Sequence, residues 1–377
     1  MTVPRTVRRT AALLAVLTAC LALLAPTAVA SPTAAVQRTV VATGLDHPRG
    51  ITVLPGGIVL IAESGSGGDG PCVPGAQDVE LCLGDSGAIT AAWRGHQTRI
   101  VTGLPSLGAA DGSEATGPHD VALTPSGTLH IALGGTETAD LRDQLGPDGQ
   151  ALGQLVEARL TGGWKPIADL TAFEAAHNPD GADVHANPYG LGVNGAGTYV
   201  ADGGANTIVR VDRRDGISLE AVLPPRMTPA PPFLGLPPGT EIPMESVPTA
   251  VTRGPDGALH VAEFTGFPFT AGASRVVRIG DDGEVSVVAD GFTNVIDVAY
   301  DRHRRLYVLE IFRNGAASGD PTGALTRVDP DGTRTVLADD LITPTSVAVA
   351  PNDDVYVTNA ALQVGGGEVL RLRATRP

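Results

Sequence analysis

The stretch DVAYDRHRRLYVLE at residues 297–310 contains a short apolar strand, a polar turn and a second apolar strand. The same pattern returns as SVAVAPNDDVYVTN at residues 346–359. Turns such as PGG, PSG, PDG and PNDD supply the Gly, Asn and Asp residues that tight hairpins need. Six copies begin at Gly50, Asp120, Gly190, Ala250, Asp297 and Ser346, with spacings of 70, 70, 60, 47 and 49 residues.

A second pair of strands follows each hairpin, for example SRVVRIG and then EVSVVAD. Four-stranded units of about 40 to 50 residues in tandem are typical of a β-propeller. The last unit has only three strands, and VQRTVVATG at 36–44 reads as its missing outer strand. The sequence therefore predicts an all-β fold, a six-bladed β-propeller of four-stranded antiparallel blades, with the ring closed by the N-terminal strand.

Composition excludes several classes of protein. The 377 residues include 41 acidic and 26 basic side chains, for a net charge of -15, which argues against a nucleic-acid-binding protein. A single lysine, Lys165, leaves little for a lysine nucleophile or a P-loop. The 42% hydrophobic content is enough for a sizeable core and excludes global disorder.

The first thirty residues are typical of a secretory signal peptide. Three arginines precede an apolar run at 11–24, and an A-x-A site at 28–30 precedes Ser31. We therefore expect a signal peptide at 1–30, a single propeller domain at 31–377 and a secreted protein. The alternative is a lipobox ending at Cys20, which would give a lipid-anchored protein. No second stretch is long and apolar enough for a membrane span, and a monomer is expected.

Cys72 and Cys82 are the cysteines left after removal of the leader. An isolated pair in an exported protein predicts a disulfide. A thiolate metal site is the alternative, but no histidine lies near the pair in the sequence.

The longer repeats carry their extra residues between strands b and c or between strands d and a, where a to d number the strands of a repeat. Both connections lie on one side of the ring, so we expect one loop-rich face that binds a ligand or shields the channel. The insertions are 64–86, 134–152 and 313–322 after strand b, and 102–118, 171–188 and 224–248 before strand a. The proline-rich 224–248 segment, with Met227, Phe233, Leu234 and Leu236, predicts a semi-rigid lid packed on this face.

Acidic side chains recur at equivalent positions of the repeats. The ends of strand b give Glu63, Leu133, Asp202, Glu263, Glu310 and Asn359, and the starts of strand a add Asp120 and Asp297, with Arg49 and His119 one residue before two starts. We expect these side chains to converge around the channel as ligand-binding candidates. Oxygen ligands suit Ca²⁺ or Mg²⁺, with Glu63, Glu263 and Glu310 as metal candidates and Ca²⁺ as the possible cofactor.

Two other interpretations of the acids stay open. The segment around Asp202 resembles the NHL-type propeller repeat, in which such an aspartate accepts backbone hydrogen bonds. Carboxylates held close together also raise one another's pKa, which suits acid–base catalysis. A further loop, with His177, Asp180, Asp183, His185 and Asn187, is either a cation clamp or a solvated polar loop. The sequence contains no G-x-S-x-G, H-E-x-x-H, P-loop or EF-hand motif.

Several longer segments are similar to the ScyD/ScyE family, exported propellers named after members encoded with the biosynthesis of the pigment scytonemin. They are GPCVPG (70–75), TGLPSL (102–107), GSEATGPHDVAL (112–123), NPYGLGV (187–193), SVPTAV (246–251), EFTGFPF (263–269), GFTNVIDVAY (291–300) and GDPTGAL (319–325). The resemblance covers essentially the whole mature chain and implies a six-bladed propeller. It supplies no catalytic residues.

A looser resemblance is to propellers of the gluconolactonase/regucalcin and strictosidine synthase kinds. The former implies a divalent cation held by an acid at the start of blade one, but the matching His47–Gly50 stretch contains none. Two hypotheses follow. The first is a secreted protein that binds a small molecule, glycan, cation or partner protein on its loop-rich face. The second is a metal-dependent lactonase or hydrolase, so whether the chain is an enzyme stays open.

Overall fold

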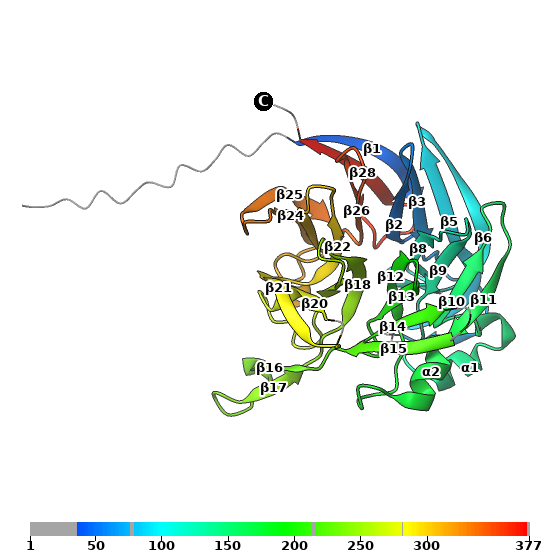
Figure 1. Ribbon diagram of the computed structural model, residues 1–377. Coiled ribbons are helices and arrows are strands. Elements are labelled where there is room, and N and C mark those ends of the chain that lie inside the picture. Colours follow the sequence, from blue (N-terminus) through cyan, green and yellow to red (C-terminus); the bar gives the residue numbers. More distant parts are fainter. Residues whose placement is uncertain (1–35, 76–78, 213, 215, 281, 375–377) are drawn as a thin grey trace, which may run out of the picture. The chain divides into compact units, whose positions relative to one another are not determined.

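The computed structural model describes residues 36–75, 79–212, 214, 216–280 and 282–374. The expected leader at 1–30, including Cys20, lies outside the described residues. Within them, six blades of four strands stand around a common centre (Figure 1), which confirms the six-bladed β-propeller. The sheet of blade one is extended by two short strands, β4 (Cys72–Pro74) and β7 (Ala115–Thr116). None of the helices in these ranges has the length and apolar character to cross a membrane.

Each blade runs from an inner strand at the channel to an outer strand at the rim. Blades one to three contain β2 (Pro48–Leu54), β3 (Ile58–Glu63), β5 (Glu80–Trp93) and β6 (His96–Ala109); β8 (Pro118–Leu123), β9 (Leu129–Leu133), β10 (Gln154–Ala158) and β11 (Trp164–Asp169); and β12 (Pro188–Asn194), β13 (Gly197–Asp202), β14 (Thr207–Asp212) and β15 (Gly216–Val222). Blades four and five contain β18 (Pro248–Arg253), β19 (Leu259–Glu263), β20 (Ser274–Ile279) and β21 (Val285–Phe292); and β22 (Val295–Tyr300), β23 (Leu306–Glu310), β24 (Thr322–Val328) and β25 (Arg334–Ile342).

Blade six closes the ring. Its inner strands are β26 (Val347–Val349), β27 (Val355–Asn359) and β28 (Gly367–Ala374). The outer strand is β1 (Val36–Leu45), which pairs antiparallel with β28 and comes from the other end of the described chain. The predicted closure by the N-terminal strand is therefore confirmed, and it covers an edge that would otherwise be unpaired.

The hydrophobic core lies between neighbouring blades. One cluster combines Leu60 and Ile89 of blade one with Val121 and Ile131 of blade two, all less than 2% exposed. Another joins blades six and one through Leu45, Ile61 and Val369. Because both faces of a blade are covered, its central strands bury nearly every residue, and all five residues of β9 are buried.

The insertions lie between strands b and c or d and a, as expected, and the opposite turns have two to five residues. Two insertions contain short helices, α1 (Ala139–Gln144) and α2 (Leu170–His177), where the sequence indicated only loops. The α2 helix begins after Asp169, whose side chain accepts a hydrogen bond from Ala172 N at 2.9 Å. It ends at Asn178, which adopts a left-handed conformation.

The 224–248 insertion forms a separate two-stranded sheet of β16 (Arg226–Pro229) and β17 (Glu241–Met244). Figure 1 shows it projecting outward from the ring beside β20 and β21. Phe233 is 76% exposed and Met227 is 60% exposed, so these apolar side chains do not pack on the face as the lid interpretation expected.

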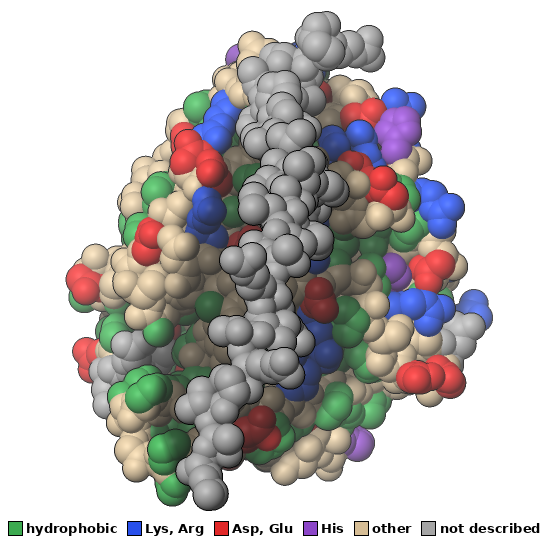
Figure 2. Space-filling model, turned by 90° about the vertical axis from the view of Figure 1, so that its left-hand side faces the viewer, with side chains coloured by type: hydrophobic (Ala, Val, Ile, Leu, Met, Phe, Trp, Pro, Cys, Tyr) green, Lys and Arg blue, Asp and Glu red, His purple; other side chains and the backbone are tan. Residues whose placement is uncertain are grey.

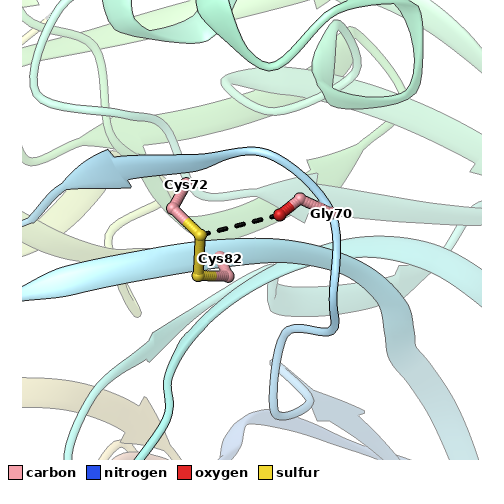
Figure 3. The surroundings of a disulfide bond; sticks show 3 residues. All are labelled: Gly70, Cys72 and Cys82. Carbon is pink, nitrogen blue, oxygen red and sulfur yellow. Dashed lines mark hydrogen bonds between the residues drawn. A yellow bond between two sulfur atoms is a disulfide. The ribbon is translucent and has the colours of Figure 1, made fainter.

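The predicted disulfide is confirmed. Cys72 and Cys82 are bonded, and they face each other across the pair formed by β4 (Cys72–Pro74) and β5. Cys72 Sγ also lies 3.6 Å from the carbonyl oxygen of Gly70 (Figure 3). The bond fastens the first insertion to a long strand of blade one.

The closure of the ring by β1 can be tested at Leu45, which is 1% exposed in the core between blades six and one. Leu45→Ala should lower the free energy of unfolding by about 2–5 kcal/mol because it leaves a cavity. Val40→Ala, on the same strand but 52% exposed, is the control and should change it by less than about 0.5 kcal/mol. Chemical denaturation measures both; equal effects would contradict the role of β1 in the core.

Candidate functional site

The acids at the ends of strand b are buried within their own blades. Glu63 is 0% exposed and accepts hydrogen bonds from Asp46 N at 2.8 Å and from Thr90 Oγ1 at 2.5 Å. Its other contact is an ion pair with Arg99, at 2.8 Å between Nη2 and Oε2. Glu63 therefore fastens the connection that leads into strand β2.

The equivalent residues of other blades have the same kind of partner. Each fixes a backbone or hydroxyl group shortly before strand a, as follows: Asp202 accepts from Asn187 N at 2.6 Å, Glu263 from Ser246 Oγ at 2.6 Å, Glu310 from Thr293 N at 2.6 Å and Asn359 from Ile342 N at 2.7 Å. Glu263 also forms an ion pair with Arg275. This arrangement supports the structural interpretation of these positions.

The structure does not bring Glu63, Glu263 and Glu310 together. Among the residues it describes, one group of three carboxylate, thiol or imidazole ligands lies within metal-binding distance, Cys72, Glu80 and Cys82. The two sulfurs of that group are bonded to each other. The calcium site expected at the three glutamates thus has no preformed cluster, and the calcium prediction itself stays a prediction.

The polar loop at 177–187 is also largely occupied by its own contacts. His177 Nδ1 lies 2.9 Å from Phe173 O, Asp180 accepts from Asn206 Nδ2 at 2.9 Å, and Asn187 Oδ1 accepts from Gly135 N at 3.3 Å. Asp183 is exposed and His185 is half-buried.

Glu174 on α2 is a buried acid that was not predicted from the sequence. It is 2% exposed, and burial with the charges of Asp180 and Asp202 raises its pKa to about 7. A single acid in a short loop segment does not indicate, from the sequence alone, that its side chain is buried.

A polar cavity of about 260 Å³ occupies the centre of the ring, lined by the inner strands of all six blades. Register defines two layers of residues on these strands. The first layer is Arg49, His119, Tyr189, Thr249, Ile296 and Thr345, and the second layer is Gly50, Asp120, Gly190, Ala250, Asp297 and Ser346. The starts of strand a that the sequence singled out are thus brought together.

First-layer side chains contact the next blade through its carbonyl groups. Thr249 Oγ1 donates to Val295 O at 3.2 Å, and Thr345 Oγ1 donates to Pro48 O at 2.8 Å. His119 Nδ1 lies 3.0 Å from Pro188 O.

Second-layer side chains accept hydrogen bonds from the backbone of the next blade. They do so as follows: Asp120 Oδ2 from Leu191 N at 2.8 Å, Asp297 Oδ2 from Val347 N at 2.8 Å and Ser346 Oγ from Ile51 N at 3.1 Å. We call the two sets of contacts the inner belt. It supplies partners for backbone groups of strands that have no neighbour on the channel side.

Asp120 has an unusual environment within the inner belt. Burial, and then the charge of Asp297, raise the pKa of Asp120 to about 8. Its carboxylate also occupies the space beside Gly50, where a Cβ would lie 2.1 Å from Asp120 Oδ1. Only glycine at position 50 leaves room for this acid.

Asp297 is the second acid of the cavity. It accepts from Ser346 Oγ at 2.6 Å and from the N–H of Val298 at 2.7 Å. Burial raises its pKa to about 6, although these hydrogen bonds stabilise the charged form.

The remaining polar groups of the first layer lie next to one another. The His119 ring lies 4.8 Å from the ring of Tyr189, between centroids. Burial and the charge of Arg49 lower the pKa of His119 to about 3, so the imidazole is neutral at pH 7. Arg49 donates to Ala115 O at 2.8 Å, and burial raises the pKa of Tyr189.

The belt contacts alone do not require a carboxylate. Ser346 accepts a backbone N–H with a neutral hydroxyl, whereas Asp120 and Asp297 place two acids in a small cavity, where burial disfavours their charge. Each carboxylate also has lone pairs beyond those used by the belt. These lone pairs are available to a positively charged ligand.

Comparisons with known proteins support the fold only. No protein-family model matches the chain, and neither does any curated protein. A protein of unknown function from Bacteroides thetaiotaomicron aligns over 90% of this chain and 76% of its own, with 9% identity and a TM-score of 0.55. A glucose dehydrogenase aligns over 90% and 100%, with 14% identity and a TM-score of 0.51.

A catalytically inactive virginiamycin B lyase from Staphylococcus aureus aligns over 90% of this chain and 99% of its own, with 13% identity and a TM-score of 0.49. The two likenesses with TM-scores above 0.5 support the propeller architecture of the chain and not an activity.

The structural role of the strand-b acids is testable at Glu63. Glu63→Gln should lower the free energy of unfolding by about 1–3 kcal/mol in EDTA, because buried donors lose a charged acceptor. Calcium should not change this difference. A variant that loses stability only in the presence of calcium would instead identify Glu63 as a metal ligand.

The pH dependence of stability tests Asp120. In the folded protein the Asp120 carboxyl keeps its proton up to about pH 8, whereas in the unfolded chain it loses the proton near pH 3.8. The free energy of unfolding therefore falls as pH rises between these two values. Asp120→Asn should become more stable relative to wild type from pH 5 to pH 8, by up to about 1.4 kcal/mol per pH unit.

Denaturant unfolding at several pH values measures this difference. Asp183→Asn, at an exposed position, serves as the control. A stability difference for Asp120→Asn that does not depend on pH would contradict the raised pKa.

Proposed function

We propose that this chain is a secreted binding protein of the ScyD/ScyE type, whose central cavity holds a small, positively charged ligand. The ligand is a divalent cation such as Ca²⁺ or a small organic ammonium group. The observation that carries the proposal is the convergence of Asp120 and Asp297 in one polar cavity, at positions where other blades have Gly, Ala or Ser.

Electrostatics supports a cation in particular. Burial, and then the charge of Asp297, raise the pKa of Asp120, and a positive charge beside the two acids offsets both effects. Cation binding then requires loss of the Asp120 proton. The affinity therefore increases as pH rises toward about 8.

Two further observations support the wider proposal. The disulfide is compatible with an exported protein, as is the leader-like sequence before residue 31. The insertions that extend one face, including α1, α2 and the β16–β17 hairpin, offer additional contact surface for a ligand, glycan or protein partner.

Thermal melts test the proposal directly. We expect millimolar Ca²⁺ or choline, compared with EDTA alone, to raise the melting temperature by a few degrees at pH 8. A ligand at about 100 times its Kd adds about 2.7 kcal/mol of stability. Between pH 8 and pH 6 the Kd should increase by up to about tenfold per pH unit.

Asp297→Asn should abolish the shift, and Glu310→Gln is the matched control because Glu310 lies in the same blade but is bound to Thr293 N. A shift that persists in Asp297→Asn contradicts the cavity as the binding site. Response to Ca²⁺ alone or to choline alone distinguishes the two classes of ligand, and response to neither rejects the proposal.

A hydrolase or lactonase is the second candidate function. At pH 7 the pKa values of about 8 and about 6 leave Asp120 protonated and Asp297 ionised, as a general acid and a general base require. A panel of lactones and esters, with and without Ca²⁺, tests this. Turnover that Asp120→Asn and Asp297→Asn both lose supports it, and an inert panel rejects it.

A further inference from the structure

A second cavity, of about 660 Å³, lies at the seam where blade six meets blade one. Its walls come from β1, from the turns of blade one, from a turn of blade six and from β28. The residues that shape it are Val40, Leu54, Trp93, Pro351, Tyr356 and Arg371. Because these turns join strands a to b and c to d, the cavity opens on the face opposite the insertions. We call it the seam groove.

Specific contacts hold the groove in shape. The Gln97 side chain donates to Thr43 O at 2.7 Å and accepts from Thr43 N at 3.0 Å, which fixes the outer strand of blade one against β1. Tyr356 forms part of the floor and is 4% exposed. A Cβ at Gly57 would lie 3.8 Å from its hydroxyl group, an ordinary van der Waals distance.

The groove exposes apolar side chains that the core does not use. Trp93 is 41% exposed and Val40 is 52% exposed, and both line the cavity. The guanidinium carbon of Arg94 lies 4.7 Å from the centroid of the Trp93 ring. An indole ring held beside apolar walls favours a flat apolar ligand.

The charge of the groove is opposite to that of the chain. Its charged lining residues are Arg94, Arg371, Arg373 and Asp354, which sum to +2 in a protein of net charge -15. On the face that Figure 2 shows, acidic and basic side chains lie beside one another. The local excess of arginine therefore indicates an anionic ligand.

The two arginines on β28 differ in their pairing. Arg373 forms a two-pronged ion pair with Asp354, at 2.6 Å for both Nε and Nη2. In the part of the chain that the structure describes, Arg371 forms no ion pair of this kind, although its charge, after that of Arg373, also lowers the pKa of Asp354. Arg371 lines the groove, so its guanidinium group is available to an anionic ligand there.

We infer that the seam groove is a second binding site, for a small molecule with a flat apolar body and one anionic group. The apolar body lies against Trp93 and Tyr356, and the anion accepts from Arg371. This inference does not depend on the ligand of the central cavity, since the two sites share no lining residue.

The dye 8-anilinonaphthalene-1-sulfonate has this chemistry and serves as the probe. The chain has two tryptophans, so Trp164→Phe leaves Trp93 as the single reporter. In this background we expect saturable quenching of Trp93 fluorescence with one dye per chain. The uncharged dye N-phenyl-1-naphthylamine should bind at least about tenfold more weakly, since hydrogen bonds to charged groups contribute about 1.5–3 kcal/mol.

Arg371→Gln should weaken dye binding by about tenfold or more. Arg302→Gln is the matched control: Arg302 lies on the same face in a turn of blade five, is paired with Asp353 at 2.9 Å and does not line the groove. Val40→Asp, at an exposed position, adds a negative charge to the groove and should also weaken binding even if Arg371→Gln folds poorly.

Three results would overturn the inference: absence of saturable quenching, equal affinity for the two dyes, or unchanged affinity in both Arg371→Gln and Val40→Asp. Circular dichroism and thermal melts without dye confirm that each variant is folded. A Ca²⁺ titration in the same background leaves Trp93 fluorescence unchanged if the two sites are separate, and a large change would contradict their separation.

Discussion

The inner strands of the ring face a constraint that no sheet can satisfy alone. Each has a neighbour on one side only, so backbone N–H and C=O groups on the channel side need other partners. The inner belt supplies them from the side chains of adjoining blades: His119 and Asp120 reach β12, Asp297 reaches β26, and Ser346 reaches β2. These contacts bind whole blades to each other, whereas hydrogen bonds within a blade do not.

This way of satisfying the backbone determines the chemistry of the cavity. A hydroxyl group accepts one N–H and adds no charge, as Ser346 does. An aspartate accepts two, from its own strand and the next, as Asp120 does with Val121 N and Leu191 N, but it brings a charge into a buried site. Burial disfavours the ionisation of both acids, the charge of Asp297 further disfavours that of Asp120, and the resulting cavity is suited to a cation.

The repeat, the ring closure and the disulfide were predictable because each has a recognisable local sequence pattern. Six hairpins in one register fix the blades, and a spare strand at 36–44 fits a repeat that lacks one. The register also correctly aligned Glu63, Glu263 and Glu310, which belong to three different blades. The register could not show that these acids would form ion pairs within their blades, as Glu63 does with Arg99 and Glu263 does with Arg275.

Other features depend on distances that a sequence pattern does not contain. The coupling between Asp120 and Asp297 requires the ring to bring blades two and five around one cavity. Phe233 is exposed because its hairpin extends outward from the ring. The proline content of the segment is equally compatible with a hairpin that folds back onto the face. The seam groove combines Val40 with Arg371 from opposite ends of the described chain.

The proposed function depends on Asp120 staying protonated in the cavity, because burial and then the charge of Asp297 raise its pKa to about 8. Carbon-13 NMR of protein labelled at aspartate carboxyl carbons measures it directly, with Asp120→Asn to assign the signal. The account predicts that Asp120 titrates near pH 8 and that its pKa falls when the cavity is occupied by a cation. An Asp120 signal that titrates near pH 4, with or without a cation, would contradict it.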